Sequence, residues 1–145
     1  MPSTVLRTNF FGPSQSPGRA SFSDWLERSL TNGDPIVVFS DVLFSPLSLQ
    51  RLIELVELVV DQRRPGVYNL GSRQGKSKAD FAFALADALD LPTETMSRGT
   101  ADAVPLTAYR PKDMRMDSTH FEKVFGVVLP SLQEEIHALK GALRR

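Results

Sequence analysis

The residues most suggestive of chemistry lie in one glycine-containing loop, which reads Gly71-Ser-Arg-Gln-Gly75-Lys76-Ser77. A Gly-Lys-Ser triplet ahead of a helix is the pattern with which P-loop proteins bind the phosphates of a nucleoside triphosphate. That pattern requires four residues between its two glycines, whereas three residues separate Gly71 from Gly75. Ser77 is followed by Asp80 in the spacing of a helix N-cap. We therefore interpret the loop as a turn that leads into a helix.

The other residues with catalytic or metal-binding side chains form no recognisable motif. His120 and His137 are the only histidines, and neither has a second ligand at the spacing of a metal site. We expect surface or packing roles for both histidines, and no metal site. The pair Glu134-Glu135 is interpreted as solvated charge on an exposed helix. The sequence contains no cysteine, no G-x-S-x-G nucleophile motif and no G-x-G-x-x-G dinucleotide motif.

Two arginines are candidates for ligand contacts. Arg7 lies at the centre of an apolar strand and is expected to find a partner, because burying an unpaired charge is costly. Arg110 precedes Pro111 in an extended segment, where a guanidinium can bind a phosphate or a carboxylate through two parallel bonds. From the residues alone, both a structural ion pair and a ligand contact remain open for each.

The elements that must position these residues alternate between strands and helices, which is typical of an α/β chain. Strands are predicted at residues 5–11, 36–39, 42–44 and 67–70, and helices at 22–30, 48–62, 78–89, 117–125 and 131–143. Residues 91–105 are predicted to be a polar connection with little structure. In the helix at 48–62, one apolar face is predicted, formed by Leu49, Leu52, Ile53, Val56, Val59 and Val60. So few strands make a poor sheet alone, so we expect the chain to be part of something larger.

Composition limits the class of protein. The chain has 145 residues, 41% of them hydrophobic and 23% charged, with a formal net charge of zero. These values are typical of one globular domain and do not favour a nucleic acid or an anionic membrane as partner. No apolar run is long enough to span a membrane, and the first residues lack the pattern of a secretory signal. A cytoplasmic location is therefore expected.

Several segments, taken together, resemble one family. They are Val5–Gly12, Phe44–Leu52, Gly66–Gly71 followed by Ser77 and Phe81–Ala86, and Arg110-Pro111 followed by Met116–Ser118, Phe125-Gly126 and Leu129–Leu132. Their order and spacing are similar to those in the C-terminal half of extended short-chain dehydrogenase/reductases, most closely the branch of dTDP-4-dehydrorhamnose reductase. The resemblance runs from about Thr4 to Leu139.

The resemblance implies a fold and an activity. Such enzymes move a hydride between NAD(P) and a sugar carbon of a nucleotide-diphosphate sugar. Residues 1–145 then correspond to a single substrate-binding domain, the C-terminal portion of a Rossmann-type fold whose sheet includes the strands near 4–11 and 66–70. The family's glycine-rich cofactor loop and its Tyr-x-x-x-Lys are absent, because Tyr68 is followed four residues on by Ser72 and Tyr109 by Asp113. The chain alone is therefore expected to bind no cofactor and to supply no catalytic residue.

The resemblance also implies site residues and partners. Asn9, Thr8 and Arg110 match positions that contact the substrate, and Arg7 and Thr8 lie where relatives approach the nicotinamide cofactor. The implied partners are a nucleotide-diphosphate sugar and a missing cofactor-binding half. The alternative is a non-catalytic interaction or regulatory module of the same fold that forms an oligomer. Reductase, epimerase and dehydratase remain open.

Overall fold

The computed structural model describes residues 1–105 and 108–142 as an α/β fold. Its elements, in chain order, are β1 (Thr4–Thr8), β2 (Phe10–Phe11), α1 (Phe22–Asn32), β3 (Ile36–Phe39), β4 (Leu43–Phe44), β5 (Leu47–Ser48), α2 (Leu49–Gln62), β6 (Gly66–Leu70), β7 (Lys76–Ser77), α3 (Lys78–Ala88), β8 (Met96–Gly99), a 3-10 turn (Ala101–Ala103), β9 (Asp113–Met114), α4 (Thr119–Phe125) and α5 (Leu132–Ala142). The predicted end of the last helix, Leu143, lies outside the described residues.

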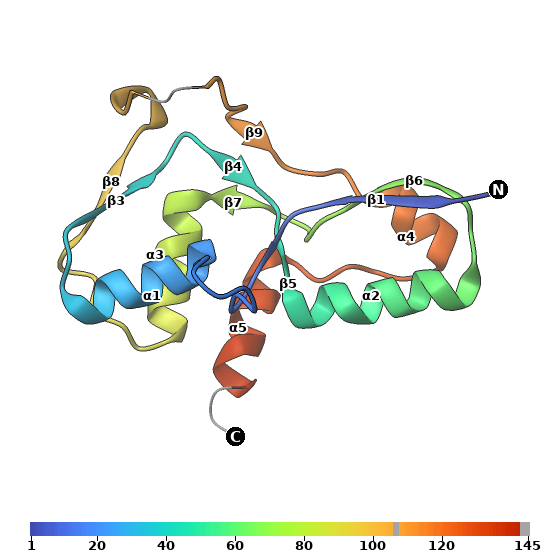
Figure 1. Cartoon of the computed structure of the whole chain (residues 1–145), viewed down its shortest axis with the longest axis horizontal. Coiled ribbons are helices and arrows are strands. Elements are labelled where there is room, and N and C mark those ends of the chain that lie inside the picture. The colour runs from blue at the N-terminus through green and yellow to red at the C-terminus, as the bar shows by residue number, and fades with distance from the viewer. Residues whose placement is uncertain (106–107, 143–145) are drawn as a thin grey trace.

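The strands pair in small, separate sheets. Parallel pairs join β1 to β6, β2 to β5 and β3 to β8, while β4 lies between antiparallel β7 and parallel β9. Figure 1 shows the consequence for the shape of the molecule. The β1–β6 pair lies with α2 and α4 at one end, and β3, β8, α1 and α3 lie at the other.

The strand predicted over residues 5–11 is divided in two at Asn9. Thr8 pairs with Leu70 in the β1–β6 sheet, whereas Phe10 pairs with Leu47 in the β2–β5 sheet. The backbone carbonyl of Asn9 accepts a hydrogen bond from the Leu47 N–H at 3.1 Å. Prediction of a single strand was wrong because the apolar run continues across the point where the chain changes partner.

The connection predicted to lack structure contains a strand. Residues Met96–Gly99 form β8, which pairs in parallel with β3 from Ile36↔Met96 to Phe39↔Gly99. The segment has no β-branched residue, so its strand character comes from the partner strand rather than from local preference. The two-residue strands β5, β7 and β9 were missed for the same reason.

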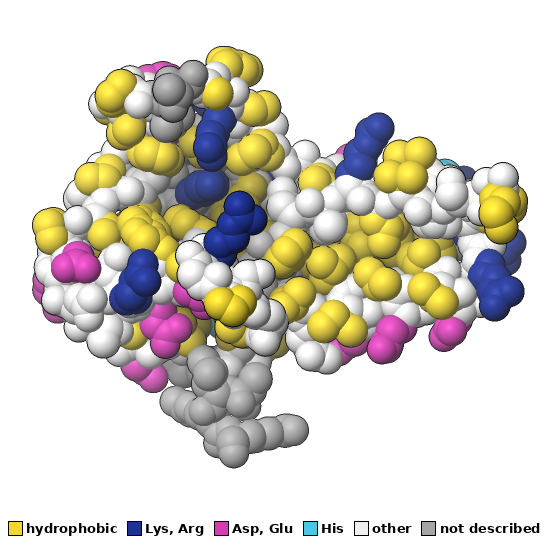
Figure 2. All heavy atoms as spheres, viewed as in Figure 1, with side chains coloured by type: hydrophobic (Ala, Val, Ile, Leu, Met, Phe, Trp, Pro, Cys, Tyr) yellow, Lys and Arg dark blue, Asp and Glu magenta, His cyan; other side chains and the backbone are white. Residues whose placement is uncertain are grey.

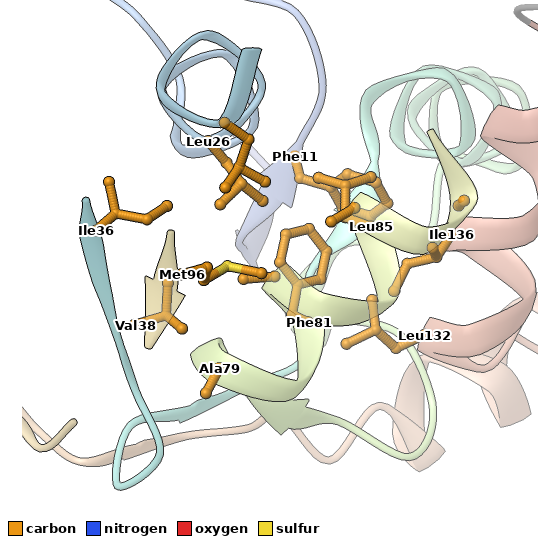
Figure 3. Packing of buried hydrophobic residues seen from close by; sticks show 14 of the residues in the cluster. Phe11, Leu26, Ile36, Val38, Ala79, Phe81, Leu85, Met96, Leu132 and Ile136 are labelled. Carbon is orange, nitrogen blue, oxygen red and sulfur yellow. The ribbon is translucent and has the colours of Figure 1, made fainter. Parts of the chain in front are cut away.

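Each end of the molecule has its own hydrophobic core. The larger core surrounds Phe81 of α3, whose ring makes edge contacts with Phe11 and Phe44 at centroid distances of 5.0 and 5.2 Å. Figure 3 shows Phe81 among side chains that come from α1, α5, β2 and β8. The smaller core packs Tyr68 and Leu70 of β6 against helices α2 and α4. His120 stacks on Tyr68 at 5.3 Å, as expected for a packing role.

The buried face of α2 differs from the predicted one. Leu55 and Val59 are buried, whereas Ile53, Val56 and Val60 are exposed at 47%, 40% and 62%. The helical prediction was right, but within the described residues this chain covers only part of the apolar surface of the helix. Contiguous exposed apolar surface is a common feature of interaction surfaces.

Glu135 corrects a second prediction, because its side chain is buried at 2% exposure rather than solvated. One carboxylate oxygen accepts the Ser48 N–H at 2.7 Å, and the other lies 3.5 Å from Nε of Arg51. The carboxylate therefore joins α5 to the N-terminus of α2, where a negative charge is favourable.

Within the described residues, no helix combines the length and the apolar character needed to cross a membrane.

Candidate functional site

The glycine loop uses its backbone N–H groups for internal bonds. The N–H of Gly71 donates to Oγ of Ser118 at 2.9 Å, that of Ser72 to the Ser45 carbonyl at 2.9 Å, and that of Arg73 to the Pro130 carbonyl at 2.8 Å. A P-loop binds phosphate with the same kind of backbone groups. These donors are already satisfied, which supports the interpretation of the loop as a turn.

The two glycines of this loop are explained by close packing. A Cβ atom on Gly71 would lie 2.7 Å from the Ser45 carbonyl oxygen, and one on Gly75 would lie 2.5 Å from that of Phe44. Ser77 then caps α3, since its hydroxyl accepts the N–H of Asp80 at 3.0 Å. The N-cap prediction is confirmed.

A hollow of about 850 Å³ lies beside this loop. Its walls are residues 71–75, residues 115–119, Ser45, Asp113 and Glu122. Its charges are largely paired with one another, because Arg115 binds Asp113 at 2.6 Å and Arg73 lies 4.0 Å from Glu122. Arg115 holds the pKa of the Asp113 carboxyl at about 2. Asp117 also lines the hollow and forms no ion pair with the described residues, so the unpaired charge in its wall is negative and does not favour a phosphate group.

The three predicted site residues in the first strand, Arg7, Thr8 and Asn9, lie where the chain passes from β1 to β2. Thr8 and Asn9 are half-buried, and the Asn9 Oδ1 atom is buried with no hydrogen-bond partner among the described residues. Arg7 is exposed, and none of the described residues forms an ion pair with it. The structural ion pair considered for Arg7 does not form among the described residues, because β1 alternates and turns Arg7 away from the core.

Arg110 lies elsewhere, in the connection between β8 and β9. Its side chain is exposed and its charge acts on Lys78, the first residue of α3. Burial and the charge of Arg110 both lower the pKa of the Lys78 ammonium group. Asn9 lies between β1 and β2, so the predicted substrate residues come from two different segments, and no hydrogen bond joins Arg110 to Asn9 within the described part of the chain.

Ion pairs and a hydrogen bond to a carboxylate hold the segment around Arg110 in place. Lys112 binds Asp41 at 3.1 Å and also binds Asp102, and the backbone N–H of Ala101 donates to Asp41 at 2.8 Å. The Ala101 N–H and the Lys112 ammonium lower the pKa of the Asp41 carboxyl. These contacts fix both ends of the connection that carries Arg110.

Lys78, the first residue of α3, is a half-buried cation that sequence reasoning did not single out. Its ammonium group lies 5.2 Å from the ring centroid of Phe22 and 5.7 Å from that of Phe44. The only signal in the sequence was the excess of basic residues at the end of the glycine loop. No cluster of metal-ligating side chains occurs in residues 1–105 and 108–142.

Comparisons with known proteins place this geometry in a family. The family model described as the RmlD substrate binding domain matches residues 3–144. A curated relative, "Probable low-salt glycan biosynthesis reductase Agl14" of Haloferax volcanii, is 20% identical over 121 residues, which cover 83% of this chain and 40% of the relative.

Solved structures show the same fold. The dTDP-4-dehydrorhamnose reductase of Clostridium acetobutylicum superposes with a TM-score of 0.83 at 20% identity, covering 98% of this chain and 49% of that one. The Bacillus anthracis reductase, solved with NADP, superposes with a TM-score of 0.82 at 17% identity, covering 93% of this chain and 47% of that one. The UDP-N-acetylglucosamine 4-epimerase of Methanobrevibacter ruminantium superposes with a TM-score of 0.72 at 15% identity, covering 99% of this chain and 46% of that one. The chain thus spans less than half the length of these relatives.

Because the family model matches nearly all residues, this chain belongs to the RmlD substrate binding domain family.

Proposed function

We propose that this chain is the substrate-binding half of an NAD(P)-dependent nucleotide-sugar reductase of the dTDP-4-dehydrorhamnose reductase type. The dinucleotide-binding half would come from other sequence, either on the same polypeptide or on a separate one. The observation that carries this proposal is an open strand edge beside an uncovered apolar helix face.

The open edge belongs to β1. Among the described residues β1 pairs with β6 alone, so its other edge presents unpaired backbone groups. Next to it lies a groove of about 470 Å³, lined by Pro2, Thr4, Leu6, Val56, Val59, Val60, Arg63 and Pro65. Figure 2 shows a continuous band of hydrophobic side chains over this end of the molecule. A further parallel strand with its helix would cover both the edge and the band.

The substrate would lie at the carboxyl ends of the two paired strands. In open α/β sheets, ligands bind in the crevice outside these ends. β1 ends at Thr8, immediately before Asn9, and β6 ends at Leu70. The unpartnered Oδ1 of Asn9 supports a ligand contact, because buried polar atoms normally have a partner. Arg110 supplies a guanidinium suited to a diphosphate.

The relatives support the cofactor as well. The Bacillus anthracis structure contains NADP, and this chain lacks the G-x-G-x-x-G motif with which such folds bind a dinucleotide. NAD(P) would therefore bind to the other half, with Arg7 and Thr8 approaching it only in the complete enzyme.

A non-catalytic interaction module is the second candidate, and the same exposed band favours it. The two functions differ in what they require of Asn9 and Arg110. A module that only binds a protein partner has no use for an unpartnered buried amide or a free guanidinium.

Thermal unfolding with dTDP-sugars and UDP-sugars tests the proposal. A ligand present at about 100 times its dissociation constant should add about 2.7 kcal/mol to the free energy of unfolding. Asn9→Ala and Arg110→Met should each lose most of this stabilisation, whereas the exposed control Asn69→Ala should keep it. If none of the nucleotide sugars stabilises the wild type, the interaction module is the better account.

A further inference from the structure

The strand that follows Asn9 is too short to hold itself in place. β2 consists of Phe10 and Phe11, and among the described residues it pairs only with the two residues of β5. A pair of strands this short has little stability of its own, because its few hydrogen bonds must offset the loss of backbone entropy. Other contacts must therefore fix the backbone around Asn9, the residue to which the proposed function assigns a substrate contact.

Ser23, in the first turn of α1, supplies two such contacts. Its Oγ atom accepts the N–H of Gly12 at 3.0 Å and donates to the carbonyl of the same residue at 3.0 Å. One hydroxyl group thus binds both backbone polar groups of Gly12, the residue directly after β2. Gly12 also packs closely on α2, since a Cβ atom there would lie 3.2 Å from Cβ of Leu49. The end of β2 is therefore held by the beginnings of both helices.

Asp24 holds the next part of the loop. Its Oδ2 atom accepts the N–H of Ser21 and the N–H of Ser14, each at 2.9 Å. These backbone bonds, from Ser21 first and from Ser14 next, lower the pKa of the Asp24 carboxyl, so the group is ionised at neutral pH. Hydrogen bonds to an ionised acceptor are stronger than those between neutral groups. A single carboxylate thus joins the start of the loop between β2 and α1 to its end.

The helix that carries these two side chains is anchored in the larger core. Leu26 and Leu30 of α1 are buried there, and β2 contributes Phe11 to the same core (Figure 3). The cap at Ser21 closes one end of the helix, and Gly33 closes the other. Residues 15–20, between the two attached parts of the loop, are exposed. The first turn of α1 is therefore a fixed support for a segment that has few contacts of its own.

We propose that Ser23 and Asp24 are positioning residues for the substrate site, and that they hold residues 9–14 so that the Asn9 side chain can bind the ligand. This inference rests on the proposed function. Neither side chain has to touch the ligand, because both act through backbone bonds to Gly12 and Ser14, three and five residues after Asn9. Planar peptide units leave only two soft dihedral angles per residue, so a shift at Gly12 moves Asn9 as well.

Hydrogen exchange at the Leu47 amide measures this support without a ligand, because that N–H donates to the Asn9 carbonyl at 3.1 Å. The exchange rate is compared with that of the Leu85 amide in α3, which reports on the larger core. In Ser23→Ala and in Asp24→Ala, the ratio of the two rates should rise at least about 5-fold, the factor that corresponds to one hydrogen bond. An unchanged ratio in both variants would overturn the inference.

Gly33→Ala is the matched control. It strains the same helix at its far end, where φ is 74°, and an added Cβ there has no atom within 4 Å. The variant should melt at a lower temperature, yet it leaves every bond to Gly12 and Ser14 in place. Its ratio of exchange rates should equal that of the wild type.

Calorimetric titration with dTDP-glucose and UDP-glucose tests the consequence for the site. Ser23→Ala and Asp24→Ala should each weaken binding roughly 5- to 10-fold, by the same conversion. Ser23→Thr keeps the hydroxyl group and should retain most of the affinity, and Gly33→Ala should bind as the wild type does. An equal loss of affinity in Gly33→Ala would show that only the stability of α1 matters, and would overturn the positioning role.

The inference and the proposed function fail in different ways. Equal affinity of the wild type and both alanine variants for these sugars would refute the positioning role and leave the proposed function intact. If no dTDP-sugar or UDP-sugar binds the wild type, the proposed function fails, and the positioning role in the substrate site fails with it. The exchange ratio then still shows whether Ser23 and Asp24 fix the backbone at Asn9.

Discussion

At the scale of single residues, the carboxylate of Glu135 makes the most consequential buried contact. It accepts the N–H of Ser48 at 2.7 Å and lies beside Arg51, so it holds α5 against the start of α2. Asn9 and Thr8, at the neighbouring strand crossover, depend on β2 and β5 being held in register. The Glu135 contact therefore helps to hold Asn9 and Thr8 in position without touching them.

Glu135→Ala should lower the free energy of unfolding by about 2–4 kcal/mol, because it leaves a buried N–H without an acceptor. Urea unfolding measures this loss. Glu57→Ala on the exposed side of α2 is the matched control and should change stability by less than about 0.5 kcal/mol. Equal, small effects for the two variants would show that the Glu135 contact carries little energy.

Residue identities alone could not reveal these roles. The pair Glu134-Glu135 looks like two solvated charges, yet only Glu134 stays at the surface, where its carboxylate accepts the Ser131 N–H at 2.7 Å. Which of two adjacent acids is buried depends on how α5 docks against α2, and a contact across 87 positions leaves no local pattern. The effect of the like charge of Arg110 on Lys78 was hidden for the same reason, since the two residues are 32 positions apart in the sequence.

At the scale of elements, the start of α3 explains the glycine loop. Ser77 caps the helix through the N–H of Asp80, and Asp80 in turn accepts the Ser77 hydroxyl at 2.8 Å. Lys76 and Ser77 also form β7, which pairs with β4. The Gly-Lys-Ser triplet is thus a strand that runs directly into a capped helix.

Ser77→Ala should therefore cost about 1 kcal/mol of stability, the usual value of an N-cap. Chemical denaturation measures this loss in the free energy of unfolding, with Ser16→Ala in an exposed loop as the control. Mg-ATP should not stabilise either the wild type or the variant. A clear stabilisation of the wild type by Mg-ATP that is lost in Ser77→Ala would restore the phosphate-loop interpretation.

Asp80 predicts a pH dependence of stability. The Ser77 hydroxyl, and after it Arg98, lower the pKa of the Asp80 carboxyl below its ordinary value of 3.8. A carboxyl with a lowered folded-state pKa contributes stability above the unfolded value, and loses it as the pH falls through the folded value. Asp80→Asn should lose less stability than the wild type between pH 6 and pH 3, as followed by urea unfolding. An identical fall in both proteins would contradict this assignment.

The helices could be predicted from the sequence far better than the short strands. Apolar periodicity and N-cap serines are local signals: the structure confirms the predicted cap at Ser77, and Ser21 and Ser131 accept the same kind of backbone bond. The strands β5, β7 and β9 each have two residues and exist only through their partners. The division of the first strand at Asn9 was likewise set by tertiary pairing.

At the scale of the whole molecule, α2 has more apolar surface than this chain covers. The sequence predicted one apolar face, and the structure buries Leu55 and Val59 while leaving Val56 and Val60 in solvent. The resemblance to longer reductases gives this mismatch a physical meaning. Under the proposed function, the rest of the face would be buried against the cofactor-binding half.

A pair of neighbouring substitutions tests the uncovered face. Val60→Asp should change the free energy of unfolding of this chain by no more than about 0.5 kcal/mol, because the side chain is 62% exposed. Val59→Asp should cost more than about 3 kcal/mol, because it buries a charge in the smaller core. Denaturant titration of both variants gives the comparison. A large loss for Val60→Asp would mean that the chain, on its own, already covers this face.

Calorimetric titration of this chain, separately with a dTDP-sugar and with NADPH, tests the account most directly. If the chain is the substrate-binding half, the dTDP-sugar should bind at one saturable site and NADPH should give no binding heat. Saturable binding of NADPH, or no binding of any dTDP-sugar or UDP-sugar, would contradict it.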